Sequence, residues 1–210
     1  MTYNEVLDET RLIAILRGIT PSEILGVAKI LVKSGFKIIE VPLNSPDAFK
    51  SIKMLVDEYK NDKDIFIGAG TVCTVKDVET LKETGASLVI SPNVDAEVIK
   101  RSRELNLISS PGFLTPSEAY IAINAGAQSL KLFPFKRFGI AYYNDIKVIL
   151  PSEYPLVVVG GVDEENISTL LEEGVEYFGL GSSLYKPSMD LGLLKTKADF
   201  FVKAIKNYYV

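Results

Sequence analysis

Hydrophobic and polar residues alternate along the chain in two patterns. Short runs that are mostly apolar, such as RLIAILRG (11–18), DIFIGAGTV (64–72) and PLVVVGGV (155–162), have the length and the residue types of buried strands. Between such runs, segments such as PSEILGVAKILVKSG (21–35) repeat their apolar residues at helical spacing. The pattern predicts strands and helices in regular alternation.

A weak repeat marks four further strands. Each copy has a glycine where a helix ends, followed at once by strand-favouring residues. The copies are SGFKIIEVPL (34–43), TGASLVISPN (84–93), AGAQSLKLFP (125–134) and EGVEYFGLGS (173–182). With LNLISSPGF (105–113), the chain has eight predicted strands.

Eight strand–helix units predict an α/β fold, a TIM (β/α)8 barrel. Strands that are apolar throughout are typical of a parallel sheet covered by helices. This fold needs roughly 200 residues, so we expect one barrel domain over residues 1–210, with a short extra helix in MTYNEVLDET (1–10). An open doubly wound sheet is the alternative. We disfavour it because that sheet needs fewer strands and no G-x-G-x-x-G follows the first one.

Composition narrows the function to small-molecule chemistry. A net charge of -4, with basic and acidic residues intermixed, gives no basis for binding nucleic acid or an anionic membrane surface. The single cysteine, Cys73, excludes an intrachain disulfide, and the first residues lack the order of a secretory signal, so we expect a cytoplasmic protein. The chain has no histidine, the commonest general base and transition-metal ligand. We therefore expect chemistry without a metal or a cofactor.

One charged residue stands out because it falls inside an apolar strand. Lys131 lies within AQSLKLFPF (127–135), where a cation costs free energy unless it is paired, deprotonated or used in chemistry. Arg17, Glu40 and Thr71 lie in or at the ends of other strands, and the carboxyl ends of barrel strands form the active site. We expect these four side chains to meet at one mouth.

This set of residues fits class I aldolase chemistry. A lysine that can lose its proton attacks a ketone to form an imine, which is an electron sink for breaking the adjacent carbon–carbon bond. Glu40 is the candidate proton shuttle. The guanidinium of Arg17, helped by the Thr71 hydroxyl, could hold a substrate carboxylate.

The last two predicted strands suggest a second anchor for the substrate. Glycines there expose backbone N–H groups beside a helix start, the usual barrel site for phosphate. The residues are Gly160, Gly161, Gly181, Ser182 and Ser183. The substrate would then carry a carboxylate at one end and a phosphate at the other.

Other interpretations stay open from the residues alone. Lys131 and Glu40 could form a structural ion pair, Arg17 and Thr71 could be structural, and the glycines could serve tight turns. At the level of function, the alternatives are a phosphate-binding isomerase or epimerase and a non-catalytic sugar-phosphate binding module. We expect Cys73 to be a small core residue.

Seven segments together resemble a known family. They are LIAILRGITP, IIEVPLNSP, IGAGTV, ISPN, GAQSLKLFP, VVVGGV and GLGSSLY, in this order along the chain. They resemble the 2-keto-3-deoxy-6-phosphogluconate and 6-phosphogalactonate aldolases. The resemblance implies a TIM barrel, usually a homotrimer, that cleaves a phosphorylated keto-deoxy sugar acid to pyruvate and glyceraldehyde 3-phosphate.

The resemblance also implies a role for each candidate residue. It places the Schiff-base lysine at Lys131 and the acid–base glutamate at Glu40. It places the pyruvate contacts at Arg17 and Thr71, and the phosphate loops at the Gly-Gly and GSS segments.

Within the family, the chain is more similar to the phosphogalactonate branch. Asn44 in EVPLNSP and Val159 before the glycine pair follow that pattern. The expected substrate is 2-dehydro-3-deoxy-6-phosphogalactonate. The alternative is an aldolase for 2-dehydro-3-deoxy-6-phosphogluconate or 4-hydroxy-2-oxoglutarate. The chain departs from both branches at Phe135, Lys136 and Arg137, three bulky residues that we expect beside the mouth.

Overall fold

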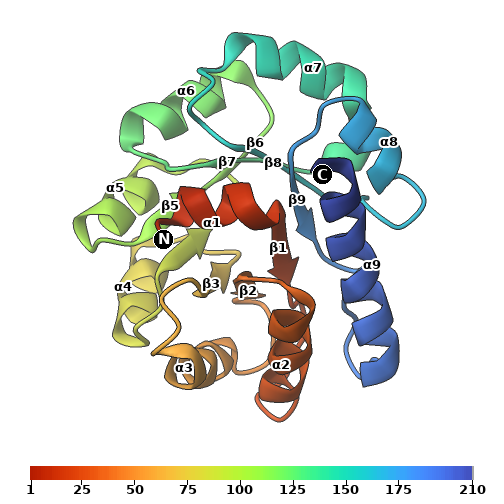
Figure 1. Cartoon of the computed structure of the whole chain (residues 1–210). Helices are drawn as coiled ribbons and strands as arrows, with labels where there is room; N and C mark the ends of the chain where they lie inside the picture. Colours follow the sequence, from red (N-terminus) through yellow and green to blue (C-terminus); the bar gives the residue numbers. More distant parts are fainter. Residues whose placement is uncertain (210) are drawn as a thin grey trace.

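The computed structural model describes residues 1–209. It is built around one sheet of parallel strands with the order β5-β4-β3-β2-β1-β9-β8-β7-β6. Helices alternate with these strands and surround them (Figure 1). The strands are β1 Leu12–Ile15, β2 Ile38–Pro42, β3 Phe66–Gly70, β4 Leu88–Ile90, β5 Ile108–Ser110, β6 Gly112–Phe113, β7 Leu130–Leu132, β8 Leu156–Val159 and β9 Tyr177–Leu180. The helices are α1 Tyr3–Thr10, α2 Ile24–Ser34, α3 Ala48–Tyr59, α4 Val75–Glu83, α5 Ala96–Glu104, α6 Pro116–Ala125, the 3₁₀ turn η1 Phe135–Arg137, α7 Gly139–Ile149, α8 Ile167–Glu172 and α9 Leu191–Tyr209.

The predicted fifth strand is divided in two, and this division closes the barrel. Pro111 separates β5, which pairs with β4, from β6, which pairs with β7. The two ends of the sheet order are therefore consecutive pieces of one segment. Across the break, the Lys131 N–H donates to the Pro111 carbonyl at 2.9 Å and the Gly112 N–H to the Ser91 carbonyl at 2.9 Å. The TIM-barrel prediction is confirmed.

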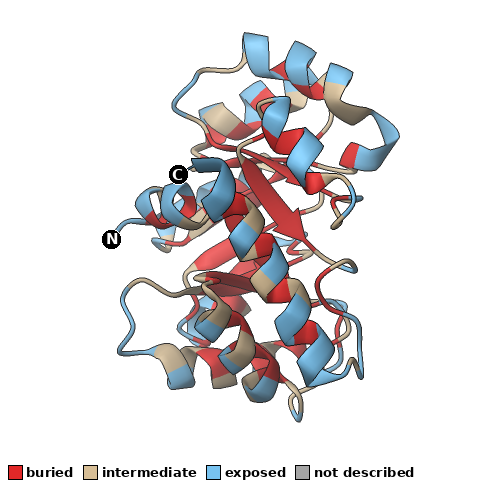
Figure 2. Cartoon of the chain, turned by 45° about the vertical axis from the view of Figure 1, so that its right-hand side comes forward, coloured by how far each residue is buried: buried red, intermediate tan, exposed pale blue. Residues whose placement is uncertain are grey.

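Alternating side chains of the strands build two apolar layers. In β1, Leu12 and Ala14 belong to the large core between sheet and helices, whereas Ile13 and Ile15 belong to a second core inside the barrel. Helix α1 lies across one end of the barrel (Figure 1) and adds Tyr3, Val6 and Leu7 to the inner core. Figure 2 shows the strands buried and the outer helix faces exposed.

Helix boundaries follow the signals read in the sequence. Gly35 and Gly126 end α2 and α6 with φ of 117° and 101°, the left-handed region that glycine tolerates best. At the other ends, Thr74 and Thr115 form capping boxes for α4 and α6. The threonines fix where α4 and α6 begin, and the glycines fix where α2 and α6 end.

The longest helix, α9, is amphipathic. It has 19 residues, from Leu191 to Tyr209. Leu194, Ala198 and Phe201 are on its buried face. None of the helices in residues 1–209 combines the length and the hydropathy that a membrane-spanning helix requires.

Candidate active site

The predicted catalytic pair lies inside the barrel. Lys131 is the middle residue of β7 and is 7% exposed, and Glu40 is the middle residue of β2 and is 1% exposed. Both line one small cavity with Ser110. The rest of its lining is apolar or small: Ile13, Ile15, Ile90, Val157, Val159 and Gly179. The barrel thus brings together two ionisable groups that are 91 positions apart in the sequence and surrounds them with hydrocarbon.

Burial shifts both titratable groups toward their neutral forms. It raises the pKa of Glu40 to about 7, although the positive charges of Lys131 and Arg17 pull that pKa down. Burial lowers the pKa of Lys131, which the Glu40 charge opposes and the Arg17 charge reinforces. The cavity therefore favours loss of the Lys131 proton and places this amine beside a carboxyl group that exchanges its proton near neutral pH.

The geometry does not fit a structural ion pair. None of the ion pairs formed by residues 1–209 includes Lys131 or Glu40. Within the same residues, Glu40 Oε2 is buried and has no hydrogen-bond partner. Lys131 Nζ lies 4.9 Å from the centroid of the Phe133 ring. A buried carboxylate oxygen without a partner is costly, so this arrangement favours a group kept for chemistry.

Gly70 makes room for the Glu40 carboxylate. A Cβ atom built on Gly70 would lie 1.6 Å from Glu40 Oε2, so no other residue fits without displacing the carboxylate. From IGAGTV, only Thr71 was predicted to be functional, and Gly70 was missed. The sequence feature that could have identified Gly70 is its position directly before Thr71.

Thr71 has an unusual backbone conformation. It follows β3 directly, is half-buried and has a φ of 58°. The left-handed region is rare for a β-branched residue and costs free energy. Strain of this kind is concentrated at functional sites, which supports the sequence-based choice of Thr71, although this residue is not among those lining the small cavity.

A larger cavity of about 500 Å³ gathers all five predicted phosphate residues. Gly160 and Gly161 have φ of 98° and 86°, a conformation that L side chains rarely adopt. Ile15, Val159 and Gly179 line both this cavity and the small one, so the two cavities adjoin.

Arg17 lines the larger cavity, not the small one with Lys131. Its Nη1 donates to Asn44 Oδ1 at 3.0 Å, and the guanidinium is exposed. Its charge nevertheless acts on the pKa of both Lys131 and Glu40. Its contact with a carboxylate remains a prediction.

Two expectations about side chains near the mouth were wrong. Phe135 is 5% exposed and packs in the outer core, so of the three bulky residues after β7 only Lys136 lines the larger cavity. Arg137 is exposed outside it. Cys73 is exposed, not in the core, because it follows Thr71 in the loop between β3 and α4, beyond the last buried residue of that segment.

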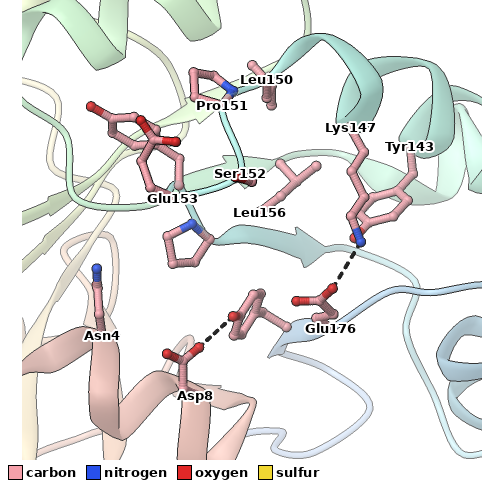
Figure 3. Close-up of a pocket in the computed structure, with 13 residues that line it drawn as sticks. Asn4, Asp8, Tyr143, Lys147, Leu150, Pro151, Ser152, Glu153, Leu156 and Glu176 are labelled. Atoms are coloured by element: carbon pink, nitrogen blue, oxygen red, sulfur yellow. Dashed lines mark hydrogen bonds and ion pairs between the residues drawn. The ribbon is translucent and has the colours of Figure 1, made fainter.

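A separate cavity of about 360 Å³ lies at the amino-terminal end of the barrel, between α1 and the loop before β8 (Figure 3). Its lysine, Lys147, is paired with Glu176 at 3.0 Å, and the Tyr177 hydroxyl donates to Asp8. Its lining has three carboxylates, those of Asp8, Glu153 and Glu176, and one lysine, which is paired and partly exposed, so it lacks the buried amine found at the other end. Within residues 1–209, no three His, Cys, Asp or Glu side chains gather closely enough to hold a metal ion.

The fold and the two adjoining cavities define a TIM-barrel protein with its polar groups at the carboxyl ends of the strands. Residues 3–194 match the family described as KDPG and KHG aldolase. The chain belongs to this family, whose members are aldolases and therefore carbon–carbon lyases. The sequence-based recognition of the family is confirmed.

Relatives and solved structures agree with this assignment. The chain is 44% identical to the probable 2-dehydro-3-deoxy-6-phosphogalactonate aldolase of Rhizobium meliloti, over 90% of this chain and 89% of the relative. It is 42% identical to the 2-dehydro-3-deoxy-6-phosphogalactonate aldolase of Escherichia coli, over 93% and 95%. The structure described as native KDPGal superposes with a TM-score of 0.90 at 40% identity, over 94% of this chain and 95% of that one. A designed porous cage, made by fusing symmetric oligomeric domains, also gives 0.90 at 40% identity, over 94% and 73%.

Proposed function

We propose that this protein is a class I aldolase that cleaves 2-dehydro-3-deoxy-6-phosphogalactonate to pyruvate and D-glyceraldehyde 3-phosphate. One observation carries the chemistry: a lysine that forms no ion pair within residues 1–209, buried in hydrocarbon beside a carboxyl group whose pKa is about 7. The substrate follows from the two relatives, at 42% and 44% identity, that are named for it.

The reaction begins with attack of the neutral Lys131 amine on the C2 carbonyl of the substrate. Glu40, in its acid form, protonates the carbinolamine hydroxyl, which leaves as water and gives the iminium. The Glu40 carboxylate then takes the proton of the C4 hydroxyl. The C3–C4 bond breaks, its electron pair enters the iminium to form an enamine, and glyceraldehyde 3-phosphate departs.

The second half of the cycle releases pyruvate. Glu40 returns its proton to C3 of the enamine, which restores the iminium. One water molecule then hydrolyses this iminium to pyruvate and the free amine, replacing the water lost in the first step. A group with a pKa near the working pH suits both directions of proton transfer.

The adjoining cavities fit the two ends of the substrate. The phosphate is bound in the larger cavity through backbone N–H and hydroxyl groups. Five of the lining residues supply them: Gly160, Gly161, Gly181, Ser182 and Ser183. Arg17 and Thr71 hold the carboxylate. The effect of the Arg17 charge on Lys131 and Glu40 supports a position close to the reacting carbons.

The substrate assignment is tested by comparing kcat/KM for the two epimers. We expect 2-dehydro-3-deoxy-6-phosphogalactonate to exceed the phosphogluconate epimer by about tenfold or more, because a few hydrogen bonds decide such a difference. The Lys131→Ala variant should lose activity on both, which shows that the measured rate belongs to this site. Equal or reversed rates, or a preference for 4-hydroxy-2-oxoglutarate, would overturn the choice of substrate.

We further propose a homotrimer in the cytoplasm. Helices α6 and α7, with the residue just before α7, carry five exposed apolar side chains, together called the α6–α7 patch: Tyr120, Ile121, Phe138, Val148 and Ile149. The Tyr120 hydroxyl donates to the Ile149 carbonyl at 2.7 Å, which joins the two helices, and Val148 is 85% exposed. A similar chain serves as a symmetric oligomeric domain in the designed cage. Contact with another copy of the chain would remove this patch from water. We expect light scattering to give the mass of three chains.

A further inference from the structure

The proposed function leaves three lysines of the larger cavity, Lys136, Lys186 and Lys197, without a role. Lys136, in η1, lines the same cavity as Gly161 and Ser183. Its backbone N–H donates to the Gly160 carbonyl at 3.0 Å, which ties the turn after β7 to the glycine turn after β8. The position of Lys136 is therefore fixed relative to the predicted phosphate loop.

The side chain of Lys136 lies against the backbone of that loop. A Cβ atom built on Gly161 would come within 2.5 Å of Lys136 Cβ and 2.8 Å of Lys136 Cδ. The absence of a side chain at Gly161 thus leaves the space that the lysine stem occupies. The stem therefore runs along the glycine turn, and Lys136 lines the cavity beside the loop that would hold the phosphate.

Within residues 1–209, Lys136 forms no ion pair and no side-chain hydrogen bond, whereas two of the other three basic residues of the cavity have a side-chain partner. Lys197 is paired with Glu164, and Arg17 donates to Asn44. Lys136 and Lys186 take part in none of the ion pairs or side-chain hydrogen bonds of these residues. An unpaired cation beside exposed backbone N–H groups is a site for an anion.

The carboxylates of the cavity do not compensate this charge. Asp163 accepts hydrogen bonds from the backbone N–H groups of Glu165 and Asn166, at 3.1 and 3.2 Å, and so organises the turn before α8. Glu164 is occupied by Lys197. Two cations therefore remain for a bound ligand, of which Lys136 is the one in contact with the glycine turn.

We propose that Lys136 is a phosphate-binding residue that makes the enzyme select phosphorylated over unphosphorylated substrates. The proposal rests on the proposed function and deepens it, because it assigns one side chain to the discrimination. The ammonium forms a charge-assisted hydrogen bond with the phosphate dianion, an interaction that an unphosphorylated acid of the same carbon skeleton lacks.

The test compares two substitutions in the same turn. Lys136→Met keeps the stem against Gly161 and removes only the charge. Arg137→Ala is the matched control, since Arg137 is an exposed cation of η1 outside the cavity. The Kd of inorganic phosphate, measured by calorimetry at low salt, should rise about tenfold in Lys136→Met and less than twofold in Arg137→Ala. The loss should shrink as salt screens the charge.

Kinetics give the specificity itself. The kcat/KM for the phosphorylated substrate should fall about tenfold in Lys136→Met, whereas kcat/KM for the unphosphorylated acid should change less than twofold. Equal losses on both substrates, or equal effects of the two substitutions, would mean that Lys136 has only a structural role.

Failure of this proposal can be told apart from failure of the proposed function. If borohydride traps no pyruvate on the wild-type protein, the imine mechanism is wrong, and the phosphate affinities still decide the role of Lys136. If wild type and Lys136→Met both trap pyruvate and bind phosphate equally, the mechanism stands and Lys136 is not a phosphate ligand.

Discussion

Glu40 and Lys131 show how burial changes the chemistry of single residues. In water the carboxyl group would be ionised and the amine protonated at pH 7. Inside the barrel, burial raises the pKa of Glu40 to about 7 and lowers that of Lys131. Each group is thereby moved toward the form that imine formation needs, an acid and a free amine.

This gain in reactivity has a cost in stability that depends on pH. The pKa of Glu40 is higher in the folded protein than its ordinary value of 4.5. The contribution of this carboxyl group to the free energy of unfolding is therefore complete below pH 4.5 and is lost as the pH rises through about 7. We expect Glu40→Gln to be more stable than wild type at pH 8, on the order of 2 kcal/mol, and to show a smaller advantage at pH 5.

Urea unfolding at the two pH values measures this difference. The same variant should turn over about 100-fold more slowly, because the amide cannot exchange a proton. If its stability relative to wild type were the same at both pH values, Glu40 would not be the buried acid described here.

At the scale of elements, strand β3 supports the site through a residue that takes no part in the reaction. Gly70 lies against the Glu40 carboxylate and has no positive φ, so alanine is allowed there by the backbone. We expect Gly70→Ala to lower kcat at least tenfold and to destabilise the fold by about 1–3 kcal/mol, because its methyl group must displace the carboxylate.

Gly26→Ala is the matched control for this prediction. Gly26 lies in α2, and a Cβ atom there meets nothing within 4 Å. We expect this variant to keep full activity and to gain about 0.5–1 kcal/mol from the helix propensity of alanine. Thermal unfolding and kcat of both variants are compared with wild type. Wild-type activity in Gly70→Ala would show that the carboxylate does not need its observed position.

Elements were predictable where local residues dictate them. Glycines mark the helix ends, and the apolar runs mark the strands, since both signals act within a few residues. The break of the fifth strand at Pro111 was not predicted, because its two halves pair with different neighbours and only closure of the barrel shows this. Nor does sequence tell where a long side chain points, as with Arg17 and Lys136.

At the scale of the whole molecule, the two ends of the barrel differ: one is closed by packed apolar side chains, and the other holds the candidate active site. Tyr3, Val6 and Leu7 of α1 close the amino-terminal end together with the inner core. Lys131 and the glycine turns line the adjoining cavities at the other end. The order of the strands could be predicted from the sequence, because consecutive strand–helix units form neighbouring strands of a parallel barrel. This order alone predicts that Glu40 and Lys131 lie in one barrel.

The size and the boundaries of the cavities could not be predicted from the sequence. They depend on how side chains from several strands pack together, as the shared walls Ile15, Val159 and Gly179 show. The sequence therefore predicted which residues meet at the mouth but not its division into two adjoining spaces. Gly70 was missed for the same reason, since its role is defined only by a neighbour on another strand.

Borohydride reduction in the presence of pyruvate tests the central claim most directly. We predict that the intact wild-type protein gains the mass of one reduced pyruvate adduct per chain, that peptide mapping places it on Lys131, and that Lys131→Ala gains none. An adduct on another lysine, or none on a folded wild-type protein, would contradict the proposal that this buried amine is the nucleophile.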